Sequence, residues 1–166
     1  GPSSQDHTMS MSSHELDAPP WLRVESTIMA TARAIRQSYD QRFNDLDLNL
    51  SEASLLAYVA EHGALSQTQI AKSLGLGRAA TGSLIDVLEG RSLVQRETDP
   101  DDRRVWLVEI TIAGKELVEE VYVRDQILRK QLRNGITRQE RQQLAAVLVR
   151  LGNNLASVLA EEIETT

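Results

Sequence analysis

A pair of short helical segments followed directly by a pair of strand-like segments constrains this chain more than any other feature. The helical segments carry apolar residues at three- and four-residue intervals and are joined by a glycine-containing turn, which is helix-turn-helix spacing. The strand-like segments alternate apolar and polar residues and are joined by a polar turn, as in a β-hairpin with a charged tip. In chain order the pattern predicts helices over 66–74 and 78–89 and strands over 93–98 and 104–110, with the turn at 99–103.

The boundaries of these two helices follow from capping residues. Residues 66–69 read Ser-Gln-Thr-Gln, the pattern of a capping box, so the first helix opens there. The second is expected to bury Leu84, Ile85 and Leu88 and to end at Gly90.

The flanking segments also have helical periodicity. A long helix is predicted from Trp21 to a turn at 45–49, and a shorter one with Ser51 as its N-cap and Gly63 as its end. Thr111 is expected to cap a further helix, and residues 137–140 form a second capping box that opens the last one. All four prolines fall outside these segments, so the sequence predicts a mainly α fold.

The first and last helices carry apolar stripes that are long relative to the core available. The stripe of the last helix comprises Leu144, Leu148, Leu151, Leu155, Val158 and Ile163. Such faces need a partner surface, so we expect a homodimer built from the chain ends.

Length and composition fit one domain, over 21–166, preceded by a tail. Residues 1–20 lack hydrophobic periodicity and begin with Gly-Pro, which resembles a protease-cleavage scar, so we expect a disordered tail. The sequence has no secretory signal and no apolar run of about 20 residues, which predicts a cytoplasmic protein without a membrane span. The chain has no cysteine, which excludes disulfides and thiolate chemistry.

The order of these elements resembles the MarR (multiple antibiotic resistance regulator) family of winged helix-turn-helix transcriptional regulators. The segments that carry the resemblance are 74–89, 93–96, 99–104 and 107–114, which are similar to that family's recognition helix, first wing strand, wing tip and return strand. The resemblance implies dimerisation helices over 21–49 and 112–166 around a winged-helix DNA-binding region over 50–111. It also implies a ligand-responsive regulator, expected to act as a repressor on a pseudo-palindromic operator.

The helix-turn-helix segment carries the sign of charge that DNA binding requires. Residues 66–84 contain Lys72 and Arg78 and no acidic side chain, although the whole chain has a formal charge of −6. Ser66, Gln67 and Thr68 at the start of the first helix are expected to donate to phosphates through side chains and free backbone N–H groups.

The leading part of the second helix is where base edges are read. Arg78, Thr81 and Ser83 lie there, and of these only Arg78 is able to bind guanine in a bidentate manner. The alternative is that Arg78 pairs only with a phosphate or with Asp86. Gly77, Ala80, Gly82 and Ser83 depart from the residues usual in the family, so we expect sparse base readout.

The hairpin tip gives a more specific signal. The family's minor-groove arginine and the aspartate that holds it match Arg103 and Asp101. The negative potential of DNA is strongest in a narrow minor groove, so an arginine binds most favourably there. Arg104 and Arg96 are then expected to contact phosphates. The alternative is a solvated hairpin whose charges cancel, since residues 66–104 hold six bases and six acids.

The family's effector lies between the dimer base and the winged region, which implies a mixture of rings and cations here. The candidates for an anionic aromatic or thioester effector are Arg33, Arg36, Tyr39, Phe43, Tyr58 and His62. The alternative is that the two rings of the first helix serve the core and its arginines face solvent.

Enzymatic and metal chemistry are not expected. There is no phosphate-binding glycine loop or nucleophile elbow, and only one histidine, His62, lies in the folded part, so no cofactor and no metal are predicted. Two readings other than a ligand-released regulator are open: a winged-helix protein-interaction module that does not bind DNA, and a DNA-binding protein without an effector.

Overall fold

A computed structural model describes residue 19 and residues 23–165 of the chain, with side chains up to residue 161. The chain divides into two compact units, residues 1–125 and residues 126–166, and each is described by itself. The expected tail, apart from Pro19, and the expected helix start at Trp21 lie outside the described residues.

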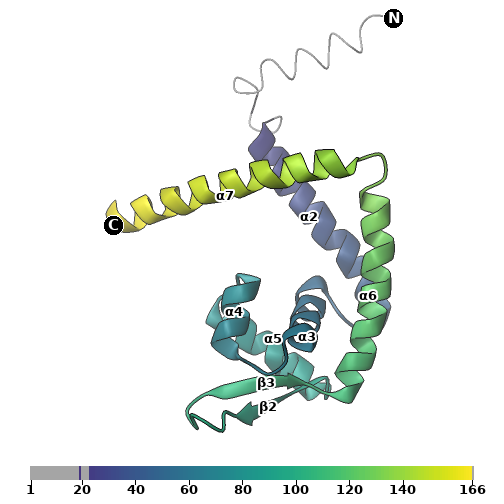
Figure 1. The fold of residues 1–166 in the computed structure, drawn as a ribbon, viewed down its shortest axis with the longest axis vertical. Helices are drawn as coiled ribbons and strands as arrows, with labels where there is room; N and C mark the ends of the chain where they lie inside the picture. Colours follow the sequence, from purple (N-terminus) through teal and green to yellow (C-terminus); the bar gives the residue numbers. More distant parts are fainter. Residues whose placement is uncertain (1–18, 20–22, 166) are drawn as a thin grey trace, which may run out of the picture. The chain divides into compact units, whose positions relative to one another are not determined.

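The first unit is helical with one small sheet (Figure 1). The helix α6 (Ile112–Leu132) begins in the first unit and continues into the second, which also contains α7 (Arg138–Thr165). This architecture confirms the predicted fold class, a mainly α winged helix-turn-helix. The preceding elements are α2 (Val24–Phe43), the 3₁₀ turn η3 (Asn44–Leu46), α3 (Leu50–His62), β1 (Leu65–Ser66), α4 (Gln67–Leu74), α5 (Arg78–Gly90), β2 (Val94–Thr98) and β3 (Trp106–Ile110).

Side-chain caps set most of the helix starts. The Ser66 capping box is confirmed, because the Gln69 N–H donates to Ser66 Oγ at 3.2 Å and the Ser66 N–H donates to Gln69 Oε1 at 2.9 Å. The second capping box is confirmed in the same way by two hydrogen bonds between Thr137 and Glu140. Thr111 caps α6 as predicted, since its hydroxyl accepts the Gly114 N–H at 3.0 Å.

The predicted cap of α3 is wrong by two residues. Asn49, not Ser51, is the N-cap, because Asn49 has the extended backbone and its side chain accepts the Glu52 N–H at 2.8 Å. Ser51 already lies within the first turn, where its hydroxyl accepts a hydrogen bond from Arg36. The predicted end of α3 at Gly63 is confirmed, with Gly63 as the C-cap at a φ of 80°.

The helix α5 ends one residue later than expected. Gly90 is still helical, and the residue that takes the left-handed conformation is Ser92, with a φ of 59°. The chain then enters β2 through Leu93, whose carbonyl accepts the Thr111 N–H at 3.1 Å. Gly114 packs on the same carbonyl so closely that an added Cβ would lie 2.2 Å from the oxygen.

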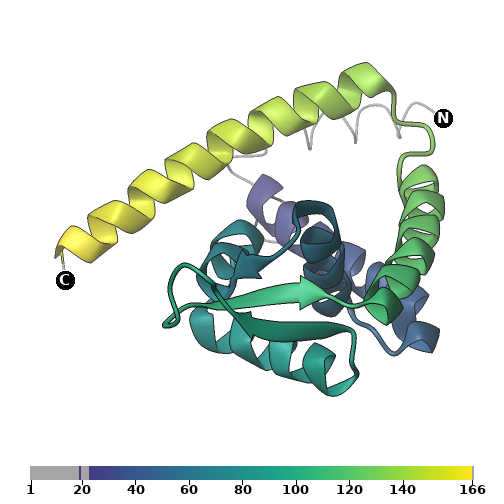
Figure 2. The same ribbon diagram turned by 60° about the horizontal axis from the view of Figure 1, so that its bottom comes forward.

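The sheet is antiparallel with strand order β1-β3-β2 (Figure 2). The hairpin pairs Val94 with Ile110 and Thr98 with Trp106. The sequence predicted these two strands but not β1, which has two residues and is too short to show alternation. β1 joins the start of α4 to the sheet, so the helix-turn-helix and the hairpin form one body.

The core of the first unit surrounds α3. Leu55, Leu56 and Val59 of this helix have no exposed surface, and they cluster with buried side chains of α2, α4, α5, β2, β3 and α6. On α5 the predicted burial of Ile85 and Leu88 is confirmed, while Leu84 is partly buried at the edge of the core.

The side chain of Arg124 ties α6 to η3 and to the end of α2. The Arg124 guanidinium bonds the Asp45 carboxylate and donates to the Arg42 carbonyl at 2.9 Å. The hydrogen bond from Arg124 lowers the pKa of Asp45 below its usual range.

Four residues of the apolar stripe of α7, in the second unit, are exposed. Leu144, Leu148, Leu155 and Val158 are between 40% and 57% exposed. Within the described residues, α7 contains the one stretch, Arg138–Glu161, that is long and apolar enough for a membrane span by length and composition, and none of it is buried. The expectation that no such stretch exists is therefore corrected, although a helix that buries an apolar face against protein meets the same test.

Candidate nucleic-acid interface

The start of α4 presents free backbone donors. The capping box uses the N–H groups of Ser66 and Gln69, so the N–H groups of Gln67 and Thr68, in the first helical turn, have no partner within the helix. Thr68 and Lys72 are exposed, and Ser66 and Gln67 are half-buried. The arrangement is suited to hold an anion at a helix N-terminus.

The side chain of Gln67 also fixes the angle between the two helices of the motif. Its amide lies against Gly82 of α5 and donates to the Arg78 carbonyl at 3.4 Å. The small residue at position 82 leaves the room for this approach, which accounts for one of the departures from the usual family pattern.

The helix α5 presents Arg78 and Ser83 to solvent, whereas Thr81 is fully buried. The Thr81 hydroxyl donates to the Gly77 carbonyl at 2.9 Å, so it is satisfied inside the domain. The prediction that Thr81 meets base edges is therefore corrected: Thr81 shares the inward face of α5 with Ile85 and Leu88. The part of the helix that remains available is its first turn together with Ser83.

Arg96 of β2 is held inside the protein by α5. Its guanidinium lies 2.7 Å from Asp86 and 2.8 Å from Glu89, and its side chain is 21% exposed. The Arg96 N–H also donates to Glu89 at 3.0 Å. These bonds correct the expectation that Arg96 is a phosphate partner, because its two terminal nitrogens, Nη1 and Nη2, already bond α5 and join the hairpin to it. In this structure Asp86 pairs with Arg96 and not with Arg78.

The hairpin tip pairs different residues from those expected. Arg104 Nε lies 3.2 Å from Asp102, and Asp101 donates its backbone N–H to the Asp99 carboxylate at 2.9 Å. Arg103 is exposed and makes no hydrogen bond or ion pair with any residue that the structure describes. The expected Asp101–Arg103 pair is thus replaced in this structure by Asp102–Arg104, and Arg103 extends freely from the tip.

The pairing of charges shows which of the six acids and six bases in residues 66–104 remain available for a ligand. Asp86, Glu89 and Asp102 are engaged by arginines. Of the six basic residues in 66–104, those that remain exposed without a partner among the described residues are Lys72 on α4, Arg78 on α5 and Arg103 at the hairpin tip. The helices α4 and α5 and the hairpin tip therefore each carry one available cation.

A cavity of about 320 Å³ lies between α2, α3 and α6 of the first unit. Two of the six candidate effector residues, Tyr39 and Phe43, line it, with their ring centroids 5.7 Å apart. The Tyr39 hydroxyl donates to the Asp125 carboxylate at 2.6 Å. The cavity is lined further by Leu50, Ala53, Ser54, Ala57, Val121 and Tyr122.

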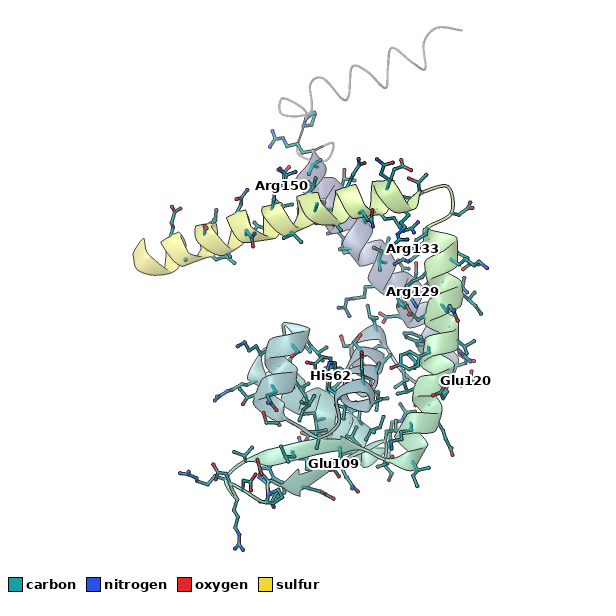
Figure 3. The ribbon with its side chains drawn as sticks, in the orientation of Figure 1. His62, Glu109, Glu120, Arg129, Arg133 and Arg150 are labelled. Atoms are coloured by element: carbon teal, nitrogen blue, oxygen red, sulfur yellow. The ribbon has the colours of Figure 1, made fainter. Side chains whose placement is uncertain are left out.

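The other four candidates do not line this cavity. Arg33 and Arg36 are exposed on α2. His62 stacks on Tyr58 with centroids 4.1 Å apart at the exposed end of α3, where Figure 3 labels it, and the Tyr58 hydroxyl donates to Ser73 at 2.7 Å. The structure therefore brings together the two rings of α2 but none of the predicted cations.

Sequence reasoning missed Asp125, the one ionisable acid in the cavity wall. A signal was available, because Asp125 occupies a position of the apolar stripe of α6, four residues after Val121 and three before Leu128. A carboxylate at such a position is a departure from the core pattern that needs a partner, and Tyr39 supplies one.

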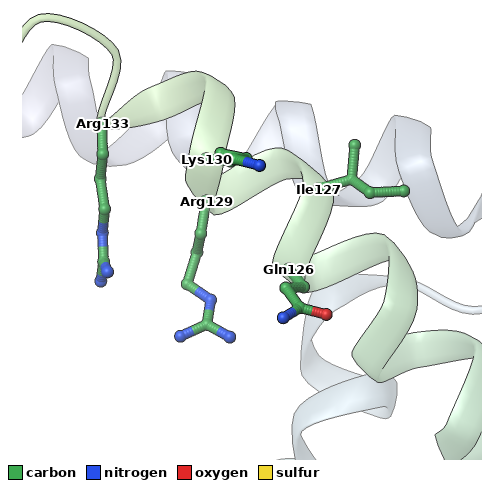
Figure 4. A pocket seen from close by; sticks show the side chains of 5 residues that line it. All are labelled: Gln126, Ile127, Arg129, Lys130 and Arg133. Carbon is green, nitrogen blue, oxygen red and sulfur yellow. The ribbon is translucent and has the colours of Figure 1, made fainter.

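The second unit has a basic groove on α6. Gln126, Arg129 and Arg133 project from the same side of the helix, and Ile127 and Lys130 complete the lining (Figure 4). In the described part of the chain no three side chains of the metal-ligating types His, Cys, Asp and Glu come together.

Comparison with known proteins agrees with the geometry. The model of the MarR family matches residues 46–105, which span α3 to the hairpin tip. Two uncharacterized helix-turn-helix-type transcriptional regulators of Bacillus subtilis (strain 168) are each 27% identical to this chain. The match to YdgJ covers 68% of this chain and 69% of YdgJ, and the match to YwaE covers 81% of this chain and 79% of YwaE.

Solved structures show the same fold. The MepR–DNA complex of S. aureus has a TM-score of 0.76 at 22% identity and covers 82% of this chain and 99% of MepR. BpsR of Bordetella bronchiseptica, whose DNA binding is regulated by 6-hydroxynicotinic acid, has a TM-score of 0.75 at 23% identity over 81% of this chain and 96% of BpsR.

The helix-turn-helix, the sheet and the hairpin tip define a winged helix-turn-helix protein. The MarR family model matches residues 46–105 and the relatives are helix-turn-helix transcriptional regulators, which confirms the predicted resemblance to the MarR family.

Proposed function

We propose that this protein is a cytoplasmic, homodimeric repressor that binds a pseudo-palindromic DNA operator and is released by a small effector. The observation that carries the DNA-binding part is the placement of Lys72, Arg78 and Arg103, one exposed cation on each of α4, α5 and the hairpin tip. Arg103 inserts into a minor groove, Arg78 meets a guanine or a phosphate in the major groove, and the start of α4 binds a phosphate.

Dimerisation follows from the exposed apolar side chains of the terminal helices. Met29 and Ile35 of α2 are 55% and 39% exposed, and Leu144, Leu148, Leu155 and Val158 of the α7 stripe are at least 40% exposed. A second copy of the chain is the partner that buries identical stripes by two-fold symmetry. The two recognition helices then contact half-sites about one helical turn, 10 to 10.5 bp, apart.

The effector is proposed to bind in the cavity between α2, α3 and α6. Its volume, about 320 Å³, is in the range of small-molecule sites. Its wall holds the Asp125 carboxylate and no cationic side chain, so a neutral or cationic aromatic molecule suits it better than the anionic one expected from the sequence. Binding lowers DNA affinity by as much as the effector prefers the conformation that does not bind DNA.

The effector class is tested by thermal unfolding with benzylamine and with benzoate. We expect the amine to raise the melting temperature and benzoate to leave it unchanged, and Asp125→Asn, which still accepts from Tyr39, to abolish the difference. Stabilisation by benzoate alone would contradict the assignment.

DNA binding is tested by capture and sequencing of fragmented genomic DNA at near-physiological salt. We expect a few enriched palindromic sites with the unaltered protein, their loss with Arg103→Ala, and their retention with Arg138→Ala, which removes an exposed arginine outside the motif. Uniform or absent enrichment would instead favour a winged-helix protein-interaction module.

A further inference from the structure

Trp106 is the first residue of β3 and directly follows the hairpin tip. Its side chain is 54% exposed, which is high for the largest apolar residue type. The two residues before the adjacent Val105 are the tip arginines Arg103 and Arg104. A single exposed aromatic residue is common on protein surfaces, so exposure alone gives this tryptophan no role, and its position in the motif is what matters.

The strand register places Trp106 on the side of the sheet that faces α5. Directly paired residues of antiparallel strands share a face, and faces alternate along each strand. Trp106 pairs with Thr98, and Val108 pairs with Arg96, so these four side chains lie on one face. Arg96 reaches Asp86 and Glu89 of α5 from this face.

Trp106 therefore lies at the junction of the two DNA-facing parts of the motif, on the α5 side of the sheet and at its hairpin-tip end. If α5 enters a major groove and the tip enters the adjacent minor groove, the sugar–phosphate backbone that separates these grooves passes over this junction. An indole ring has an apolar face that packs on deoxyribose and an N–H that donates to a phosphate oxygen.

We infer that Trp106 packs against the DNA backbone between the major-groove and minor-groove contacts and so fixes the position of α5 relative to the tip. This inference rests on the proposed function. Since the contact is with sugar and phosphate, it contributes affinity on every sequence rather than preference for one base. Since the ring is uncharged, it adds nothing to the release of counterions.

The test uses Trp21→Phe protein, in which Trp106 is the sole tryptophan of the chain. A fluorescein-labelled duplex of about 30 bp and arbitrary sequence, long enough for two half-sites, is titrated at low salt. Fluorescein anisotropy reports binding, and acrylamide quenching of tryptophan emission reports the exposure of Trp106. We expect anisotropy to rise and quenching of Trp106 to fall at least twofold.

Two outcomes overturn different claims. A rise in anisotropy with unchanged quenching would refute the role of Trp106 and leave DNA binding intact. No rise in anisotropy at any salt concentration would refute the proposed function itself, and the inference with it.

Variants give a second readout. We expect Trp106→Ala to weaken binding about 5- to 10-fold on unrelated duplexes without changing the dependence of affinity on salt, and Trp106→Phe to restore most of it. Ile112→Ala, which truncates an exposed apolar residue beyond the other end of β3, is the matched control and should bind normally. Melting curves check that each variant folds; equal affinity of folded Trp106→Ala and unaltered protein would refute the inference.

Discussion

Replacement of Arg96 by alanine tests whether this side chain stabilises the hairpin or contacts DNA. The side chain is 21% exposed and forms ion pairs of 2.7 Å with Asp86 and 2.8 Å with Glu89. The hydrogen bond from the Arg96 N–H to Glu89 does not depend on the side chain and survives the substitution. The loss is therefore that of the two ion pairs and of the packing of the side-chain stem.

The expected destabilisation follows from the exposure of the two partners. Glu89 is 40% exposed, and its charge-assisted bond to a mostly buried arginine contributes about 1.5 kcal/mol. Asp86 is 70% exposed, and solvent screening reduces its contribution to about 0.5 kcal/mol. A total of about 2 kcal/mol lowers the melting temperature of a chain of this size by about 4–8 °C.

The assay combines thermal unfolding, followed by circular dichroism, with the salt dependence of binding to a random-sequence duplex. We expect Arg96→Ala to melt earlier while the slope of log affinity against log salt stays that of the unaltered protein, because Arg96 contacts no phosphate. An unchanged melting temperature together with a slope lowered by about 0.9 would refute the reasoning and return Arg96 to the phosphate contacts.

Three further predictions concern the scaffold. Asn49→Ala should cost about 1 kcal/mol in denaturant unfolding while Ser51→Ala costs little, because Asn49 is the cap of α3; equal losses would contradict this. Gly114→Ala should destabilise by about 3 kcal/mol or prevent folding, since a Cβ would lie 2.2 Å from the Leu93 carbonyl, and a stable variant would show that α6 shifts easily. A backbone hydrogen bond lowers the pKa of Glu140, so its stabilisation of α7 is present above the ordinary pKa of a glutamate, about 4.3, and is lost as pH falls through the lower folded value. Unfolding measured from neutral to acid pH should therefore show a steeper acid loss for the unaltered protein than for Glu140→Gln, and parallel curves would argue against this cap.

Features set by short-range interactions were predictable from the sequence. The capping boxes at Ser66 and Thr137 were predicted correctly because both partners of each box lie within one helical turn. Their spacing in the sequence therefore determines their distance in the structure. The burial of Thr81 was also within reach, because it precedes Ile85 by four residues and Leu88 by seven, which places it on the core face of α5.

Features that depend on tertiary placement or loop geometry were not predictable. Asp101 and Asp102 each precede an arginine by two residues, and only the course of the tip shows that Asp102 is the one paired with Arg104. The engagement of Arg96 depends on how β2 packs on α5, which brings it to acids seven and ten residues away. The cavity combines α2, α3 and α6, so its wall could not be read from any one of these helices.

The central claim is that Lys72, Arg78 and Arg103 bind DNA phosphates or enter its grooves, and the salt dependence of binding tests it most directly. Affinity for a random-sequence duplex is measured by anisotropy over a range of salt concentrations for the unaltered protein and for each alanine variant. We expect a steep fall of affinity with salt that becomes shallower by about 0.9 on a log–log plot for each cation that neutralises a phosphate. A protein that binds no DNA at low salt, or three variants whose slopes equal that of the unaltered protein, would contradict the account.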